Sequence, residues 1–443
     1  MICPSCKALN DDAAEACFTC GRALSALTQG SVIAGRYDIR SHLGKGGMGM
    51  VYKAHDRMLD EEVAIKVLRA EFANTSEMLQ RFKKEIKLAR KVSHRNVCRI
   101  HEFGEDGGVR YISMEYVEGT DIKQLARDKG GFLEGEEAFD VAIQAADGLQ
   151  AIHDVGIIHR DLKTSNIMRD PTGRVRLMDF GIAKSEAGDR STGGGGLTTT
   201  GQIMGTPEYM SPEQCLGDKI DHRSDVYALG IVIYEIFTGT VPFRGDTPVA
   251  TLFKHIQDPV PFEGPVAARI PLAAVSVLRK ALAKGRNDRY ASAAALAEAL
   301  RKAQQQNRDG VPADTAPTGS VAAVAPPAAP GGATPTPIPD RRRVTRLDIF
   351  VNLMIRRLGT EGKVLQEERT IAENVGRGGA RVMTTIAALA PGDIVHLEEV
   401  GGPFKTRAEV RGSYVGKDHV RRLNLRFLDS PAPDYLVHVD DSR

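Results

Sequence analysis

Residues 159–166 read HRDLKTSN and are followed by Asp179 of a DFG triplet, and together they supply four polar side chains suited to one reaction. Asp161 can accept the proton of an attacking hydroxyl, and Lys163 can offset charge on a phosphoryl group in transfer. Asn166 and Asp179 offer the oxygen ligands that Mg²⁺, a hard cation, prefers. Phosphoryl transfer needs mainly orientation and charge neutralisation, so this set predicts that reaction.

A glycine-rich stretch, GKGGMG, precedes this set and contains Gly44, Gly46 and Gly49. The pattern alone is weak, because dinucleotide-binding folds also use GxGxxG at a turn from strand to helix. Here the glycines run into MVYKA, which is typical of a strand. We therefore expect a hairpin whose backbone N–H groups come close to phosphate oxygens, in preference to an ordinary glycine turn.

Lys66 ends the strand-like segment VAIK and can reach α- and β-phosphate oxygens if an acidic side chain holds it. Glu85 is the candidate partner. It lies in LQRFKKEIKLARKV, whose apolar residues recur at helical spacing. Considered alone, Lys66 and Glu85 would more often form a surface ion pair.

Taken in order, these motifs resemble those of the eukaryotic-like (Hanks-type) bacterial Ser/Thr protein kinases over about residues 37–303. The resemblance implies an α+β bilobal kinase fold, with a small β-rich lobe before a larger α-rich lobe. It implies transfer of the γ-phosphoryl group of ATP, with Mg²⁺, to protein Ser or Thr. Lysine at position 163 favours Ser/Thr over Tyr as the acceptor.

The same resemblance assigns an adenine pocket and several supporting roles. Glu213 is expected to pair with Arg289, Asp225 to hold the backbone of the catalytic loop from below, and Thr206 to contact Asp161. Residues 115–117 form the hinge that binds adenine through its backbone. The pocket residues are the gatekeeper Met114, the hinge residues Glu115 and Val117, and Val51 and Ala64, which cover the ring.

Arg160, beside the catalytic aspartate, commonly pairs in this family with a phosphate on the activation segment. The candidates here are Thr198, Thr199 and Thr200, which follow a run of four glycines. We expect autophosphorylation there to switch the enzyme on, with a homodimer acting in trans. The alternative is a flexible polar loop without regulatory phosphorylation.

Composition separates a flanking region on each side of residues 37–303. Residues 304–340 are dominated by Pro, Ala and Gly and predict a flexible linker. The chain has 59 Lys and Arg against 57 Asp and Glu, and this balance gives no reason to expect a nucleic-acid partner. No secretory signal or membrane-spanning stretch is recognisable, so we expect a cytoplasmic protein.

Cys3, Cys6, Cys17 and Cys20 form two CxxC pairs within residues 1–27. Four thiolates at this spacing can close a tetrahedral, structural Zn²⁺ site, and the segment resembles a zinc ribbon that serves in docking or self-association. A redox role is the alternative, but no thioredoxin-like βαβ pattern surrounds the pairs.

Residues 341–437 read as short strands separated by turns and predict a small β-barrel. Arg342 and Arg346 form an RxxxR pattern, and NVGRGG spans Asn374 to Gly379. These features resemble the PilZ domain of bacterial cyclic-di-GMP receptors, although Gly376 stands where that family usually has Ser. Arginines would grip the phosphates and stack on guanine.

Two further hypotheses follow from the same residues. The chain could be a pseudokinase scaffold without chemistry, or a cyclic-di-GMP effector in which the kinase is the output. Pseudokinases typically lose one of three polar residues, whereas Lys66, Asp161 and Asp179 are all in place. The sequence therefore favours an active kinase.

Overall fold

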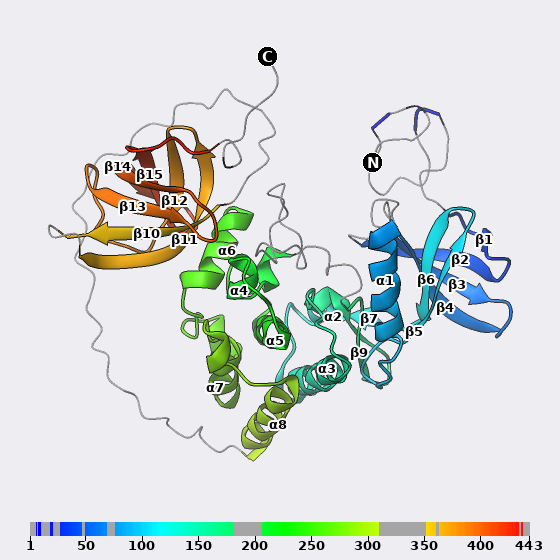
Figure 1. Ribbon diagram of the computed structural model, residues 1–443. Coiled ribbons are helices and arrows are strands. Elements are labelled where there is room, and N and C mark those ends of the chain that lie inside the picture. The colour runs from blue at the N-terminus through cyan, green and yellow to red at the C-terminus, as the bar shows by residue number, and fades with distance from the viewer. Residues whose placement is uncertain are drawn as a thin grey trace.

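The computed structural model describes residues 27–46, 49–68, 76–180, 206–309, 351–359 and 363–433, together with residues 6, 8, 9, 18–20 and 436. The described chain forms a β-rich lobe, a helical lobe and a closed β-barrel that lies beside helices α4 and α6 (Figure 1). The predicted order, a β-rich part followed by a helical part and then an all-β part, is confirmed.

The first lobe is an antiparallel sheet in the order β1-β2-β3-β4-β6-β5, with helix α1 packed on it. Its central strand β4 ends in six consecutive buried residues, because one face meets α1 and the other meets an apolar cluster around Tyr37 and Tyr52. The elements are β1 (Val32–Ile33), β2 (Tyr37–Gly46), β3 (Gly49–Asp56), β4 (Glu61–Leu68), α1 (Ser76–Ala89), β5 (Ile100–Asp106) and β6 (Val109–Glu115).

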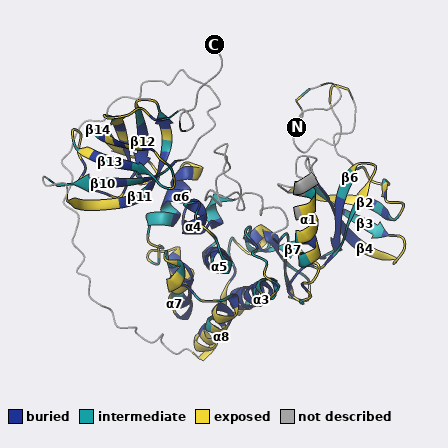
Figure 2. Ribbon diagram, viewed as in Figure 1, coloured by how far each residue is buried: buried dark blue, intermediate teal, exposed yellow. Residues whose placement is uncertain are grey.

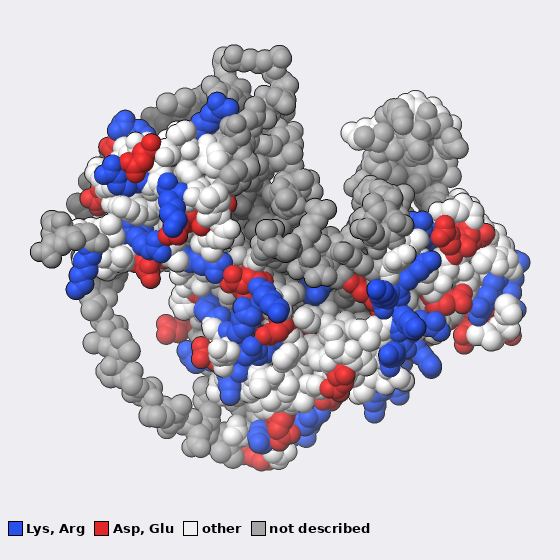
Figure 3. All heavy atoms as spheres, viewed as in Figure 1, with Lys and Arg blue, Asp and Glu red and all other residues white. Residues whose placement is uncertain are grey.

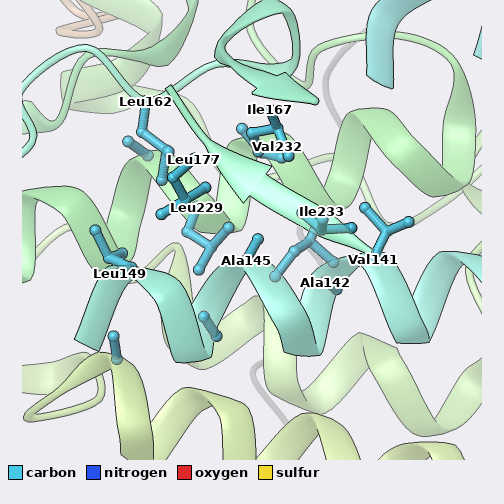
Figure 4. Close-up of a cluster of buried hydrophobic side chains, with 14 of the residues drawn as sticks. Val141, Ala142, Ala145, Leu149, Leu162, Ile167, Leu177, Leu229, Val232 and Ile233 are labelled. Atoms are coloured by element: carbon cyan, nitrogen blue, oxygen red, sulfur yellow. The ribbon is translucent and has the colours of Figure 1, made fainter. Parts of the chain in front are cut away.

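The second lobe is built around α5, which is apolar on nearly all sides and is buried accordingly (Figure 2). Leu229 of α5, Ala145 of α3 and Leu177 of β9 belong to its core (Figure 4). The elements are β7 (Thr120–Asp121), α2 (Ile122–Asp128), α3 (Gly135–Asp154), β8 (Ile167–Arg169), β9 (Val175–Leu177), α4 (Pro212–Cys215), α5 (His222–Thr238), α6 (Pro248–Gln257), α7 (Leu272–Ala281) and α8 (Ala293–Asp309).

Local sequence fixes the ends of several of these helices. Thr247 accepts a hydrogen bond from the Ala250 amide and is followed by a proline at the first turn of α6. Gly239 ends α5 with a φ of 81°, a conformation that glycine adopts at no steric cost.

Helix α8 extends to Asp309, so the linker expected from residue 304 begins later than predicted. Gln and Arg are good helix formers, and Ala303 is buried against the lobe. Gln304 and Arg308 also reach Glu136 of α3. The composition of residues 304–309 gives no sign of these tertiary contacts.

The C-terminal strands close into a six-stranded antiparallel barrel in the order β10-β11-β12-β15-β14-β13, consistent with the predicted small barrel. Apolar side chains at alternate positions fill the interior, among them Leu353, Ala372, Val382 and Leu425. The strands are β10 (Val351–Leu358), β11 (Val364–Gly376), β12 (Gly379–Met383), β13 (Ile394–Glu399), β14 (Lys405–Val415) and β15 (Arg421–Phe427).

Charges of both signs are spread over the face seen in Figure 3, with a local gathering of Lys and Arg over α1. Among the residues described, no helix is both long and apolar enough to cross a bilayer. The exposed basic residues in and just after α1 include Lys83, Lys84, Lys87, Arg90 and Lys91.

Candidate active site

One buried carboxylate on α5, that of Asp225, holds the catalytic loop in position. Asp225 accepts hydrogen bonds from the backbone N–H groups of His159 (2.7 Å) and Arg160 (2.9 Å), and His153 Nε2 lies 2.8 Å from its Oδ2 atom. Arg160 has a φ of 63°, which is uncommon for a residue with a side chain, so the loop needs this anchor. The predicted role of Asp225 in holding the loop is confirmed by these contacts.

The charge of Asp225 is maintained against its burial. Burial alone would raise the pKa of the carboxyl, but hydrogen bonds from His153 and the Arg160 amide outweigh it and hold the pKa below 3.8. Sequence motifs did not indicate His153, which lies at the end of α3. Only its position on the helix face towards α5 could have suggested it.

The loop brings Asp161, Lys163 and Asn166 together. The Asn166 amide donates to the backbone carbonyl of Asp161 (2.8 Å) and to its Oδ2 atom (3.2 Å). Lys163 Nζ lies 3.3 Å from Asp161 Oδ2 and donates to Thr206 Oγ1 at 3.3 Å. Thr206 thus lies beside the Asp161 carboxylate, linked to it through Lys163.

Lys66 Nζ donates to Asp179 Oδ1 at 2.6 Å, across the boundary between the two lobes. Asp179 has a φ of 55°, and the following Phe180 is almost completely buried near His159. Glu85 lies half-buried on α1. The pairing of Lys66 with Glu85 remains a prediction.

The glycine-rich stretch forms the hairpin between β2 and β3, with Gly46 opposite Gly49, as predicted. A Cβ atom on Gly49 would lie 1.7 Å from the backbone oxygen of Val67 in β4. Gly49 is therefore required by the close approach of two strands, whatever ligand the hairpin binds.

The apolar residues predicted to enclose adenine belong to one apolar cluster or pack against it. Val51 packs on the same apolar cluster as Ala64, Met114 and Val117, and Ala64 faces Met114 across the β4–β6 pair. Glu115 N is bonded to the Arg99 carbonyl, which fixes the start of the predicted hinge. These side chains are apolar, as a purine site requires.

A small cavity of about 20 Å³, large enough for one water molecule, lies behind Met114. Its lining was not predicted apart from three residues already named for the site. Alternation along β5 and β6 gives only a faint signal for the others, since it also describes ordinary core residues. The lining consists of Lys66, Cys98, Ile100, Ile112, Met114, Asp179 and Phe180.

Below the catalytic loop, Glu213 and Arg289 form a buried bidentate ion pair with two contacts of 2.7 Å, which confirms their predicted pairing. Burial raises the pKa of Glu213, but the Arg289 guanidinium outweighs this and the net pKa is lowered. Ser224 adds a hydrogen bond of 2.6 Å to Glu213. The pair ties α4 to the turn before α8.

The predicted Mg²⁺ ligands have suitable chemistry. Within the described residues, both hydrogen bonds of the Asn166 amide are donated by its nitrogen, so its oxygen remains to ligate a cation. Asp179 supplies a carboxylate next to Lys66. Oxygen donors of this kind fit Mg²⁺ held together with nucleotide phosphates.

Several predicted residues lie outside the described part of the chain: Thr198, Thr199, Thr200, Cys3, Cys17, Arg342 and Arg346. Cys6 and Cys20 are described and exposed. Asn374 is exposed on β11, and Gly379 begins β12, so their motif spans one hairpin of the barrel. A Cβ on Gly379 would lie 2.2 Å from the Leu425 carbonyl oxygen, which gives this glycine a structural reason.

The protein kinase domain family model matches residues 37–300, and the chain therefore belongs to the protein kinase family. It is 40% identical over 275 residues to the serine/threonine-protein kinase PknB of Mycobacterium tuberculosis, covering 60% of this chain and 43% of that one. Serine/threonine-protein kinase pkn3 of Myxococcus xanthus is 38% identical over 306 residues, covering 67% and 55%.

A probable serine/threonine-protein kinase of Clostridium acetobutylicum is 40% identical over 264 residues, covering 60% of this chain and 39% of that one. This chain thus spans about half or less of the length of these relatives. The crystal structure of the M. tuberculosis PknI kinase domain matches 63% of this chain at 27% identity, with a TM-score of 0.49. The predicted Hanks-type bacterial kinase domain is confirmed by the family model and the relatives.

Replacing Asp225 by Asn is expected to lower the free energy of unfolding of the kinase domain by about 3 kcal/mol, because an amide cannot accept all three contacts and one buried donor is left without a partner. Since the pKa of Asp225 is lowered on folding, its stabilisation is present above the unfolded pKa, near 3.8, and is lost as the pH falls further. Calorimetry at pH 7 measures the change.

The matched control is Asp147→Asn, which removes the charge of a partly exposed carboxylate paired with Arg301 on α8. Such a pair contributes about 0–1 kcal/mol. Equal unfolding temperatures for the two variants would contradict the anchoring role, as would unchanged hydrogen exchange at the His159 and Arg160 amides.

Proposed function

We propose that the chain is a Ser/Thr protein kinase that transfers the γ-phosphoryl group of ATP to protein hydroxyl groups. The observation that carries this proposal is the convergence of Asp161, Lys163 and Asn166 on one loop anchored by Asp225, next to the Lys66–Asp179 pair. Orientation and charge neutralisation are what phosphoryl transfer requires.

In this reaction Asp161 accepts the proton of the substrate hydroxyl, and Lys163 balances charge on the group in transfer. Asn166 holds the Asp161 carboxylate in place through its amide nitrogen. Asn166 and Asp179 would hold Mg²⁺, which neutralises charge on the ATP phosphates when bound. Val51, Ala64 and the hinge at 115–117 would receive the adenine.

A pseudokinase scaffold is less well supported, since Lys66, Asp161 and Asp179 are present and the described contacts join them to the rest of the site.

We also propose autophosphorylation of Thr198, Thr199 or Thr200, in trans within a homodimer. Within the described residues the Nε atom of Arg160 makes no hydrogen bond, which leaves one guanidinium donor for a phosphate on the activation segment.

Asp161→Asn is expected to reduce phosphoryl transfer by roughly 10²- to 10⁴-fold, because the general base is lost while the fold is kept. The measurement is incorporation of radiolabel from ATP and Mg²⁺ into the chain and into a generic basic protein. Phosphate is expected on Ser or Thr of the acceptor and, by peptide mapping, on residues 198–200 of the chain itself.

Asp154→Asn is the control, because Asp154 is an exposed carboxylate at the end of α3 that accepts a hydrogen bond from Gln150. It is expected to keep wild-type transfer. ATP binding without transfer by the wild-type chain, even after its residues 198–200 have been phosphorylated by another kinase, would establish the scaffold in place of the enzyme.

We further propose that Cys3, Cys6, Cys17 and Cys20 bind a structural Zn²⁺ ion in a cytoplasmic protein. Four thiolates leave no open coordination position, so the module would serve docking. We expect about one zinc ion per purified chain by elemental analysis, and a loss of that zinc in Cys6→Ser. Cys98→Ser, which removes a buried thiol elsewhere, should retain the metal; equal zinc contents in both variants would exclude this ligand set.

We propose cyclic-di-GMP as a ligand of the barrel, because Asn374 is exposed on the β11–β12 hairpin, near its turn between Gly376 and Gly379. A Cβ on Gly376 would meet its nearest atom at 3.8 Å, so Gly376→Ser fits and adds one hydroxyl. One hydrogen bond, about 1 kcal/mol, should strengthen binding about fivefold.

Calorimetric titration with cyclic-di-GMP tests this proposal. Asn374→Ala is expected to weaken binding, and Asn424→Ala, at an exposed residue on β15, is expected to leave it unchanged. No heat of binding in any variant would exclude the ligand.

A further inference from the structure

The outer surface of the barrel contains apolar side chains that are fully buried. On β12, Arg381 and Met383 point to the same, outward face by strand alternation, since Ala380 and Val382 belong to the barrel interior. Arg381 is exposed, whereas Met383 has no exposed surface. Another part of the chain must therefore cover the barrel around Met383.

Ile371 repeats this pattern on the neighbouring strand β11. Its neighbour Ala372 lies in the barrel core, so Ile371 points outward, yet it too is completely buried. The kinase domain covers this part of the barrel. Ile371, Met383 and Val420 share one apolar cluster with side chains of α4, α6 and the segment before α4. The kinase-domain members are Met210, Cys215, Val249, Ala250, Leu252 and Phe253.

Polar contacts surround this apolar centre. Arg369, on the same outward face as Ile371, forms a bidentate ion pair with Asp218, with both contacts at 2.9 Å. The Leu216 carbonyl just after α4 accepts from Asn352 (2.9 Å), and Gln257 at the end of α6 donates to the Arg369 carbonyl (2.9 Å). An apolar centre with a polar rim is the ordinary anatomy of a specific interface.

The interface is also open to water along its edges. Two hollows of about 420 and 450 Å³ lie on the seam. One is lined by Phe253 and Asp258 together with His419, and the other by Gln257 together with Glu367. Interfaces of this kind between domains of one chain commonly permit relative motion of the domains.

The covered surface connects directly to the catalytic loop. Met210 belongs to the shared cluster, and the preceding Tyr209 donates to Glu235 at 2.5 Å beside Thr164 of the catalytic loop. Thr206, at the start of the same short segment, accepts from Lys163. Whatever fixes α4 and α6 therefore also fixes residues 206–210 against the catalytic groups.

We propose that the surface formed by α4 and α6 is a docking surface for the chain's own β-barrel, and that docking supports phosphoryl transfer by holding residues 206–210 in place. Residues 310–350 join the two partners covalently, which favours docking within one chain over docking between chains. The effect on transfer rests on the proposed kinase function, whereas the docking itself does not.

The test uses the full chain with reversed charges at one ion pair. Arg369→Asp and Asp218→Arg should each release the barrel, and the double variant should restore docking because the pair is re-formed with opposite polarity. Small-angle X-ray scattering is expected to give a larger radius of gyration for each single variant and the wild-type value for the double variant. Arg407→Asp, which breaks an exposed ion pair within the barrel, should leave the radius unchanged.

Ile371→Glu provides an independent disruption, because its side chain points away from the barrel core and the barrel can fold without it. We expect release in this variant as well, together with a fall of about fivefold in kcat for a basic protein substrate and an unchanged KM for ATP. A wild-type radius in Ile371→Glu and both single variants would overturn the docking.

The remaining outcomes separate the parts of the proposal. Faster transfer on release would overturn the supporting role, and a dimeric mass that falls in Arg369→Asp would place the barrel of a second copy on this surface. If the wild-type chain transfers no phosphate, the kinase function fails, while the scattering data still decide whether the barrel docks.

Discussion

The arrangement of the catalytic groups depends on a single carboxylate that takes no part in the chemistry. Asp225 accepts hydrogen bonds from the backbone N–H groups of two consecutive residues, His159 and Arg160. Arg160 has a left-handed backbone conformation that the loop would not hold without this support. Because Asp161, Lys163 and Asn166 follow within a few residues, their mutual distances are set by this anchor. The apolar surroundings of α5 exclude competing water, so the three contacts to Asp225 are stronger than they would be at the surface.

The remaining parts of the site come from distant segments, and buried contacts bring each of them to the anchored loop. Lys66 arrives on a strand of the first lobe, while Thr206 and Tyr209 arrive on a segment held by α6 and Glu235. The Glu213–Arg289 pair fixes α4 from the opposite side. The barrel adds a further support outside the kinase domain, in contact with the same two helices. Catalytic geometry is thus stabilised in successive layers around one loop.

Much of this organisation could be predicted from sequence, because it depends on short-range signals. The catalytic-loop and glycine motifs carry fixed spacings, and the pairing of Glu213 with Arg289 and the anchoring by Asp225 followed from the family resemblance.

Contacts that join the surfaces of different domains were not predictable from the sequence. Arg369 and Asp218 are 151 positions apart, and nothing in either local sequence distinguishes their ion pair from solvated charges. The burial of Ile371 and Met383 likewise depends on which surface covers the barrel, and a strand pattern does not contain that information. The late end of α8 was missed because tertiary contacts to Glu136 outweighed a composition typical of a linker.

The cavity behind Met114 has a consequence for the design of inhibitors. Cys98 lines it next to Lys66 and Asp179, a position that invites an inhibitor with an electrophilic group. Burial, reinforced by the charge of Glu115, raises the pKa of the Cys98 thiol far above neutrality, so almost none of it is the reactive thiolate. Only a very small electrophilic group, carried by a larger inhibitor, would fit this water-sized cavity, and it would form its covalent bond slowly at physiological pH. Selectivity at this site would have to come from shape and reversible contacts with the apolar lining.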